Sequence, residues 1–282
     1  MVRFLRAALS KAPLTPCGGT GNFLKKVPLT GILRRHNVLL LCALLFCSCS
    51  KAFLPIVQSQ PAPIVVVTFD DADQSVYSVG FALMRQADTA WTATHFFPNS
   101  FIGAEGSVSL DEEKEMERAG WESGGHGREH DNLTAMPPDS AAVRIKASYD
   151  FLVQNGLSHE SFAWASGMYN DTVKAMVAGY FVNIRTSHDY YYLGGVDPKE
   201  LGYFAVKGDF TSDDIIARVE EARRDGAPLV VIGFHVIQPD TAPPLPVYYC
   251  KESAFRGFLT YLKNQQLRVM SVRDAMKILG GS

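Results

Sequence analysis

From residue 64 onwards, short unbroken apolar runs alternate with longer segments whose apolar positions recur every three or four residues. The runs at 64–69 and 229–234 contain no charged residue and are rich in β-branched side chains. Such runs are typical of strands that are buried on both faces, as in a parallel sheet covered by helices. The longer segments predict helices, so the alternation indicates an α/β fold built from βαβ units.

The spacing of the apolar residues assigns most of this region to strands and helices. The clearest of the expected strands lie at 64–71, 92–97, 121–123, 161–165, 180–184, 229–234 and 267–270. Helices are expected at 76–86, 109–120, 137–152, 170–178, 211–226 and 255–263, with a last helix after Ser271. About eight candidate strands without a break in composition favour one barrel-like α/β domain, with a doubly wound open sheet as the alternative.

Ser109 and Glu112 have the spacing of a capping box, which predicts a helix that begins after Ser109. The segment 187–208, with three consecutive tyrosines at 190–192, fits neither period and is expected to be a loop.

The first 50 residues follow a different pattern. A basic segment at 34–36 precedes an apolar run at 38–46, which is shorter than the roughly 20 residues that span a bilayer. A charged flank before a short apolar core is typical of a secretory signal. Cys49 follows a small residue at its end and resembles the acylated cysteine of bacterial lipoproteins. We expect 1–50 to be a signal or lipoprotein segment acylated at Cys49, with cleavage and release, or a retained anchor, as alternatives.

Residues 51–63 contain several prolines and glutamines and are expected to link this segment to a domain at 64–282. The protein is therefore expected to be exported to the cell envelope, or otherwise secreted or periplasmic. Only one of the five cysteines, Cys250, lies in the expected domain. The prediction of export therefore depends on the signal and not on a disulfide framework.

The charge balance of the chain argues against nucleic-acid and polybasic membrane binding. The 282 residues include 27 basic and 29 acidic side chains, which gives a net charge of −2. Because this balance is unlike that of a nucleic-acid or polybasic membrane binder, we expect no nucleic-acid partner, and membrane contact only through the N-terminal lipid anchor.

Candidate chemistry lies where strands are expected to end. Asp70 and Asp71 follow the first apolar strand, and His235 follows the strand at 229–234. The carboxyl ends of parallel strands carry the active sites of barrel and open α/β enzymes. Neighbouring side chains on a strand point to opposite faces, so the two acids share a pocket only if the chain turns there.

A second cluster contains His126 and His130. Their spacing places both imidazoles on one face of a helix or tight turn. Two histidines and one carboxylate make a three-ligand site for a divalent metal, with positions left for water. The zinc-protease motif is excluded, because Gly127 stands where that chemistry needs a glutamate.

Several short motifs, taken in order, resemble the polysaccharide deacetylase family with the NodB homology domain, also known as carbohydrate esterase family 4. The resemblance covers about Ile64 to Ile278, and its motifs are Thr68-Phe69-Asp70-Asp71, Glu117 to Glu122, His126 to His130, Phe162 to Gly167, Val231 to His235 and Leu262 to Val269. It implies a single distorted (β/α) barrel, TIM-like and commonly seven-stranded. It also implies removal of acetyl groups from a polysaccharide with a divalent metal.

Carried over to this sequence, the resemblance implies a role for each candidate. Asp71, His126 and His130 would hold the metal, Asp70 would be the general base and His235 the general acid. Zinc is the expected metal, and cobalt, nickel, manganese and iron are compatible with these ligands. The expected partner is an acetylated glycan, with the acetyl group linked through nitrogen or oxygen.

Some positions differ from the family pattern. Gly127 replaces the usual serine or threonine, and Ala72 stands where glycine is common. Ala165 and Ser166 replace a Pro-Tyr pair whose tyrosine N–H helps bind the oxyanion. The Ser166 N–H is expected to keep this role, because only the side chain differs.

Partners of the two catalytic residues are less well defined by the sequence. Asp209 is a candidate partner for His235. Arg128 and Arg185 are candidates to orient Asp70.

Three functions are compatible with these observations. A metal-dependent deacetylase is the leading hypothesis. The second is a carbohydrate-binding protein of the same fold that has lost turnover, with Tyr190 to Tyr192 stacking on sugar rings. The third is an iron(II) oxygenase with a triad of two histidines and one carboxylate, in which Asp70 and His235 would have no role.

Overall fold

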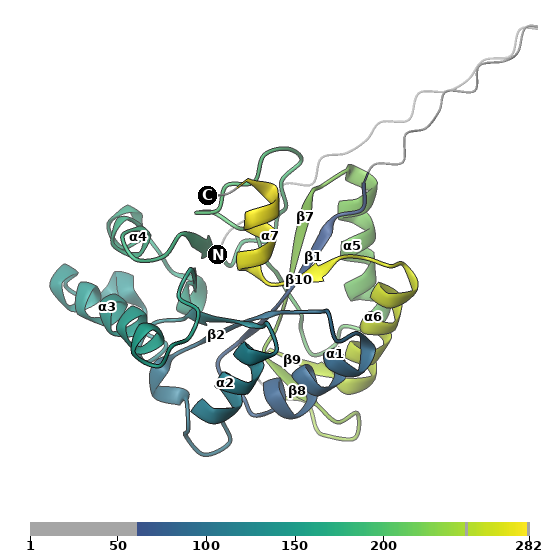
Figure 1. Cartoon of the computed structure of the whole chain (residues 1–282), viewed down its shortest axis with the longest axis horizontal. Helices are drawn as coiled ribbons and strands as arrows, with labels where there is room; N and C mark the ends of the chain where they lie inside the picture. Colours follow the sequence, from purple (N-terminus) through teal and green to yellow (C-terminus); the bar gives the residue numbers. More distant parts are fainter. Residues whose placement is uncertain (1–60, 246–247, 281–282) are drawn as a thin grey trace, which may run out of the picture. The chain divides into compact units, whose positions relative to one another are not determined.

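The computed structural model describes residues 61–245 and 248–280 (Figure 1). The predicted signal, the Cys49 acylation site and most of the predicted linker lie outside the described residues, so these stay predictions. Among the helices of the described ranges, none combines the length and the apolar character needed to cross a membrane.

Eight parallel strands form the main sheet. The strand order is β5-β4-β3-β2-β1-β7-β6, and β10 pairs with the first half of β1. These strands are β1 (Ile64–Asp70), β2 (Thr94–Phe97), β3 (Glu122–Gly125), β4 (Ser161–Ala163), β5 (Asn183–Arg185), β6 (Phe204–Ala205), β7 (Leu229–Phe234) and β10 (Val269–Met270). Two further strands, β8 (Val236–Gln238) and β9 (Tyr249–Lys251), form a small separate sheet.

The two ends of the main sheet meet. A parallel bridge joins Arg185 in β5 to Leu201, and the chain runs from Leu201 directly into β6, which pairs with β7. The sheet therefore curls into a barrel of seven successive strands, with β10 beside β1. This confirms the predicted distorted (β/α) barrel and excludes the doubly wound open sheet.

Helices cover the outside of the sheet. Figure 1 shows α5 and α6 on one side of β1 and α3 and α4 on the other. The helices are α1 (Ala82–Ala87), α2 (Leu110–Arg118), α3 (Pro138–Gln154), α4 (Asp171–Ala178), α5 (Ser212–Asp225), α6 (Glu252–Asn264) and α7 (Val272–Leu279). Shorter turns of helix are η1 (Val76–Phe81), η2 (Asn99–Phe101), η3 (Leu133–Ala135) and η4 (Ala165–Gly167).

Alternation along β1 separates the inside of the barrel from the outside. Val65, Val67 and Phe69 pack with residues of α1, α2, α5 and α6. Ile64 and Val66 pack with inward residues of the other strands and with α7. Because side chains alternate along a strand, Asp70 continues the inward row.

The helix α7 closes the end of the barrel opposite to Asp70. Its residues Val272, Ala275 and Met276 are buried against the inward residues of the strands. Its first turn is held by the strands, because Val272 N–H donates to Thr94 Oγ1 at 2.8 Å and Arg273 N–H donates to Glu122 Oε2 at 2.8 Å.

Most predicted elements are present, and the capping box at Ser109 is confirmed. Three short strands were not predicted. One of them, β6, lies in the segment 187–208 that was expected to be a loop, and β8 and β9 flank a proline-rich stretch. Each has only two or three residues, which is too short to show a period.

Candidate metal centre and active site

Asp70 and Asp71 reach the same cavity because the chain turns between them. Asp70 ends β1 and is buried on the inward face. Asp71 and Ala72 both have positive φ values, of 78° and 68°, which costs free energy for residues other than glycine. The turn was a requirement of the sequence prediction, and the structure contains it.

The two histidines lie on an irregular loop after β3 and not on a helix. Gly127 and His130 have φ values of 82° and 57°, so the glycine that departs from the family pattern occupies a position that favours glycine. Gly127 and Arg128 accept backbone hydrogen bonds through their carbonyls from Asn99 and Ser100, at 3.3 and 3.0 Å.

The helix α3 holds the same loop from the other side. Arg144 Nη1 lies 2.6 Å from Glu129 Oε1, and Arg144 Nε lies 3.7 Å from Asp131 Oδ2. These two acids flank His130. The arginine therefore fixes the loop on both sides of this candidate ligand.

The hydrogen bonding of His126 determines which nitrogen faces the cavity with a lone pair. His126 Nδ1 lies 2.9 Å from the carbonyl oxygen of Ala163, and a carbonyl only accepts. In the neutral tautomer that fits this contact, the proton is on Nδ1 and Nε2 presents its lone pair, as is usual for metal-ligating histidines.

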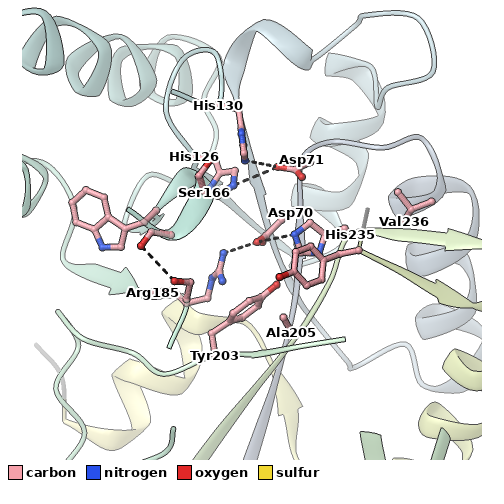
Figure 2. A pocket seen from close by; sticks show the side chains of 14 residues that line it. Asp70, Asp71, His126, His130, Ser166, Arg185, Tyr203, Ala205, His235 and Val236 are labelled. Atoms are coloured by element: carbon pink, nitrogen blue, oxygen red, sulfur yellow. Dashed lines mark hydrogen bonds and ion pairs between the residues drawn. The ribbon is translucent and has the colours of Figure 1, made fainter. Parts of the chain in front are cut away.

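Asp71 and the two imidazoles form a group that fits a divalent metal ion (Figure 2). Asp71 Oδ1 lies 3.4 Å from His126 Nε2 and 3.2 Å from His130 Nε2, and one ligand atom from each residue lies within 4.8 Å of the others. Asp71 Oδ1 is buried without a hydrogen-bond partner. Acceptor atoms that converge in this way, without a proton donor between them, suit a cation.

Electrostatics favour the ligand forms of these groups. Burial acts to raise the pKa of Asp71, but the adjacent imidazoles of His126, His235 and His130 outweigh it and hold the pKa well below its usual range. Burial and the neighbouring His126 lower the pKa of His130. Metal ligands have to be deprotonated, so both directions favour metal binding.

Asp70 forms a buried ion pair with Arg185, which confirms one of the two candidate arginines. Arg185 Nη2 lies 2.6 Å from Asp70 Oδ2, and both side chains are almost fully buried. The guanidinium packs over two aromatic rings, 3.8 Å from the centre of Tyr203 and 5.2 Å from that of Phe96. The other candidate, Arg128, is exposed and pairs with its neighbour Glu129 at 3.4 Å.

His235 leaves β7 at the edge of the cavity. Its Nε2 lies 3.8 Å from Asp70 Oδ2, and its ring stacks on Tyr248 with 5.0 Å between ring centres. His235 Nδ1 is buried without a partner among the described residues, so the predicted partner Asp209, which is exposed, does not contact it. Burial lowers the pKa of His235, against the opposing charges of Asp70 and Asp71.

Ser166 lies in η4, after β4, at the cavity wall. Its φ of 55° is again positive. Of the five residues other than glycine with positive φ in the described ranges, four line or adjoin this cavity: Asp71, Ala72, His130 and Ser166. Backbone strain of this kind is concentrated at functional sites.

All six predicted site residues line one cavity of about 600 Å³. Several other lining residues were not predicted from the sequence, among them Ser187, Tyr203 and Tyr248. Gly233, inside an otherwise apolar strand, was the available signal for Tyr203, because glycine in a strand often marks a close approach by another group.

The tyrosines at 190–192 do not line the cavity. The hydroxyl groups of Tyr190 and Tyr192 donate to the carbonyl of Glu200, and that of Tyr191 donates to Asp225. These contacts tie the loop to its surroundings. The hypothesis that the three rings stack on sugars in this site is therefore not supported.

The fold and the cavity define an α/β barrel protein with an Asp-His-His group beside a buried Asp-Arg pair. The sequence model described as polysaccharide deacetylase matches residues 58–181. Residues 58–181 thus match the polysaccharide deacetylase family, as the motifs indicated.

Solved structures with the same fold include several deacetylases. The Xyl-CE4 domain of a multidomain xylanase, from the hindgut metagenome of Trinervitermes trinervoides, is 17% identical, with a TM-score of 0.55 over 78% of this chain and 92% of that chain. The peptidoglycan deacetylase PdaC from Bacillus subtilis is 17% identical, with a TM-score of 0.52 and the same coverage. A CE4 family pseudoenzyme from Bacillus anthracis is 17% identical, with a TM-score of 0.53 over 77% of this chain and 66% of that chain. No curated protein matches the sequence.

Proposed function

We propose that the protein is a metal-dependent hydrolase that removes acetyl groups from a polysaccharide or oligosaccharide. The observation that carries the proposal is Asp71 Oδ1, which is buried without a partner and faces the Nε2 atoms of two histidines. A buried acceptor in such surroundings is costly unless a cation satisfies it.

Asp71, His126 and His130 would hold the metal, and zinc is the proposed ion. Such a metal lowers the pKa of bound water from 15.7 towards about 7 and polarises a carbonyl group. The loop contacts of Asn99, Ser100 and Arg144 keep the histidines in place for this task.

Asp70 is the proposed general base. Arg185 occupies its Oδ2 at 2.6 Å, whereas its Oδ1 is buried without a partner. The free oxygen is therefore available to accept a proton from the attacking water. The ion pair also fixes the orientation of the carboxylate, so little reorganisation is needed.

His235 is the proposed general acid. Burial lowers the pKa of its imidazole, against the opposing charges of Asp70 and Asp71. Its Nε2 lies 3.8 Å from Asp70 Oδ2. The proton that Asp70 removes from water can pass to His235 and then to the leaving amine or alcohol.

We propose an acetylated glycan of the cell envelope as substrate. The similar structures include a domain of a xylanase and a peptidoglycan deacetylase, and the expected signal with Cys49 supports export and acylation. The alternative is a carbohydrate-binding protein with impaired turnover. The loss of the Pro-Tyr pair at 165–166 and the similarity to a pseudoenzyme support this alternative.

One experiment tests the proposal. The protein from residue 51 onwards is purified, its metal content is measured, and acetate release is assayed on acetylated xylan, chitooligosaccharides and peptidoglycan. The proposal expects acetate release that is lost on chelation, recovers with zinc, and is abolished in Asp70→Asn. Glycan binding by the zinc-loaded protein without acetate release from any substrate would instead support the binding protein.

A further inference from the structure

Tyr203 has a hydroxyl group that the proposed mechanism does not use. The residue lines the cavity and is only 5% exposed, and its hydroxyl has no hydrogen-bond partner among the described residues. Figure 2 shows the side chain beside Arg185, directed towards Asp70 and His235. A buried hydroxyl without a partner is unfavourable, so a ligand of the cavity is expected to satisfy it.

The chain makes room for this ring in the facing strand. A Cβ atom added to Gly233 would lie 1.7 Å from Tyr203 Cε2, so no other residue at position 233 is compatible with this ring position. Glycine weakens the interior of a strand. The glycine in β7 therefore serves the placement of Tyr203 and not the stability of the strand.

Arg185 fixes the ring from another side. The guanidinium lies 3.8 Å from the ring centre, within the range of a cation–π contact. Burial, followed by the charge of Asp70, raises the pKa of Tyr203 well above its usual value. The hydroxyl therefore keeps its proton and is available as a hydrogen-bond donor in a fixed position.

We propose that the Tyr203 hydroxyl is a catalytic hydrogen-bond donor that contacts the acyl oxygen of the substrate. This inference rests on the proposed function. The attacking water is a poorer partner, because the proposed metal would hold one of its two lone pairs and a hydrogen bond from Tyr203 would occupy the other, which is needed to attack the carbonyl. The acyl oxygen gains negative charge during the attack, and a donor already in place stabilises this charge. The proton stays on Tyr203, so no bond to the tyrosine forms or breaks.

The test is Tyr203→Phe, which removes the hydroxyl and keeps the ring against Arg185. We expect kcat on the best acetylated substrate to fall at least tenfold, because removal of a single oxyanion donor costs about 10²–10³ in kcat and Ser166 N–H remains. KM, zinc content and the midpoint of thermal unfolding are expected to stay close to the values of the parent protein. A change that acted only through the fold would move the unfolding midpoint.

The matched control is Tyr192→Phe, which removes a phenol that donates to Glu200 O at 3.0 Å outside the cavity. Its kcat is expected to equal that of the parent protein. Gly233→Ala displaces the ring and is expected to lower kcat at least as much as Tyr203→Phe.

The outcomes separate the inference from the proposed function. A parent protein that releases acetate, with a Tyr203→Phe variant within twofold of its kcat, would overturn the inference and leave the proposed function in place. A parent protein that is inactive with zinc bound would contradict the proposed function, and with it the inference. An equal loss of kcat in Tyr192→Phe would also overturn the inference, because the effect would then not be specific to the cavity.

Discussion

At the scale of single residues, the site depends on charges that the fold removes from water. Asp70 and Arg185 are separated by 115 positions in the sequence and lie 2.6 Å apart in the barrel. The sequence indicated both residues, because each follows or ends a strand. It could not indicate the two aromatic rings that contact the guanidinium, since these depend on how β2, β5 and the segment before β6 meet.

Arg185→Met is expected to destabilise the protein, because it leaves the buried Asp70 charge without a partner. Breaking a buried ion pair by removing one member typically costs about 3–5 kcal/mol. Urea unfolding measures the change. The double variant Asp70→Asn with Arg185→Met is expected to regain most of the loss. Equal stability of the single and double variants would show that the ion pair is not coupled in this way.

Glu122 lies at the end of the barrel opposite to Asp70. Its burial predicts that the stability of the domain depends on pH. Burial raises the pKa of its carboxyl to about 7, against hydrogen bonds from Ser161, Arg273 N–H and Thr94. In the unfolded chain this pKa is near 4.5. The folded state therefore holds an extra proton between these values, and stability falls as pH rises from about 4.5 to about 7.

The expected size of this loss is about 3 kcal/mol, since each pH unit between the two pKa values contributes about 1.4 kcal/mol. The free energy of unfolding at pH 5 and pH 8 tests it. Glu122→Gln keeps the hydrogen bonds of a neutral side chain and is expected to lose this part of the pH dependence. Glu105→Gln, at an exposed position, is the control and is expected to retain it.

At the scale of elements, the sequence predicted best those segments whose ends carry local signals. The capping boxes of α2 and α5 and the Asn170 cap of α4 use hydrogen bonds within four residues, so they are readable from the sequence. The conformation of the histidine loop after β3 could not be predicted from the sequence in the same way. Its conformation depends on Asn99, Ser100 and Arg144, which come from other parts of the chain.

The end of α6 offers a test of backbone strain outside the site. Gln266 has a φ of 52°. Its N–H donates to Lys263 O at 3.0 Å, and Leu267 N–H donates to Leu262 O at 3.1 Å, which is the pattern of a Schellman motif that favours glycine at position 266. Gln266→Gly is expected to raise the free energy of unfolding by about 1 kcal/mol.

The control for this variant is the neighbouring Gln265, whose φ of −84° is ordinary. Gln265→Gly is expected to lower stability by about 0.5–1 kcal/mol, because glycine only adds freedom to the unfolded chain there. Thermal or urea unfolding of both variants provides the comparison. If both substitutions destabilise the protein, the strain assigned to Gln266 is absent.

At the scale of the whole described domain, the barrel brings together segments that the sequence shows only as separate motifs. Period and composition predicted the α/β class, and the motifs predicted six residues that line one cavity. Closure of the sheet by Arg185 and Leu201 could not be predicted, because one bridge between irregular segments leaves no pattern in the sequence. Tyr203 was not predicted for the same reason, because its segment shows neither the strand nor the helix spacing of apolar residues.

Metal binding is expected to stabilise the whole domain, because Asp71 follows β1 and the two histidines follow β3, so the ligand set is complete only in the fold. A ligand at 100 times its dissociation constant adds about 2.7 kcal/mol to the stability. Thermal unfolding with and without zinc measures the effect, and Asp71→Asn is expected to abolish it. A zinc response in Asp71→Asn as large as in the parent protein would place the ion elsewhere.

The position of α7 has a consequence for the order of events in turnover. Because this helix covers the end of the barrel opposite to Asp70, we expect that nothing enters or leaves the cavity through that end. Under the proposed function, we expect the acetyl group to reach furthest inward, towards Asp70, while the sugar chain stays near the entrance. Under the proposed function the deacetylated glycan therefore departs first, and acetate, released behind it, acts as a competitive inhibitor of the next glycan.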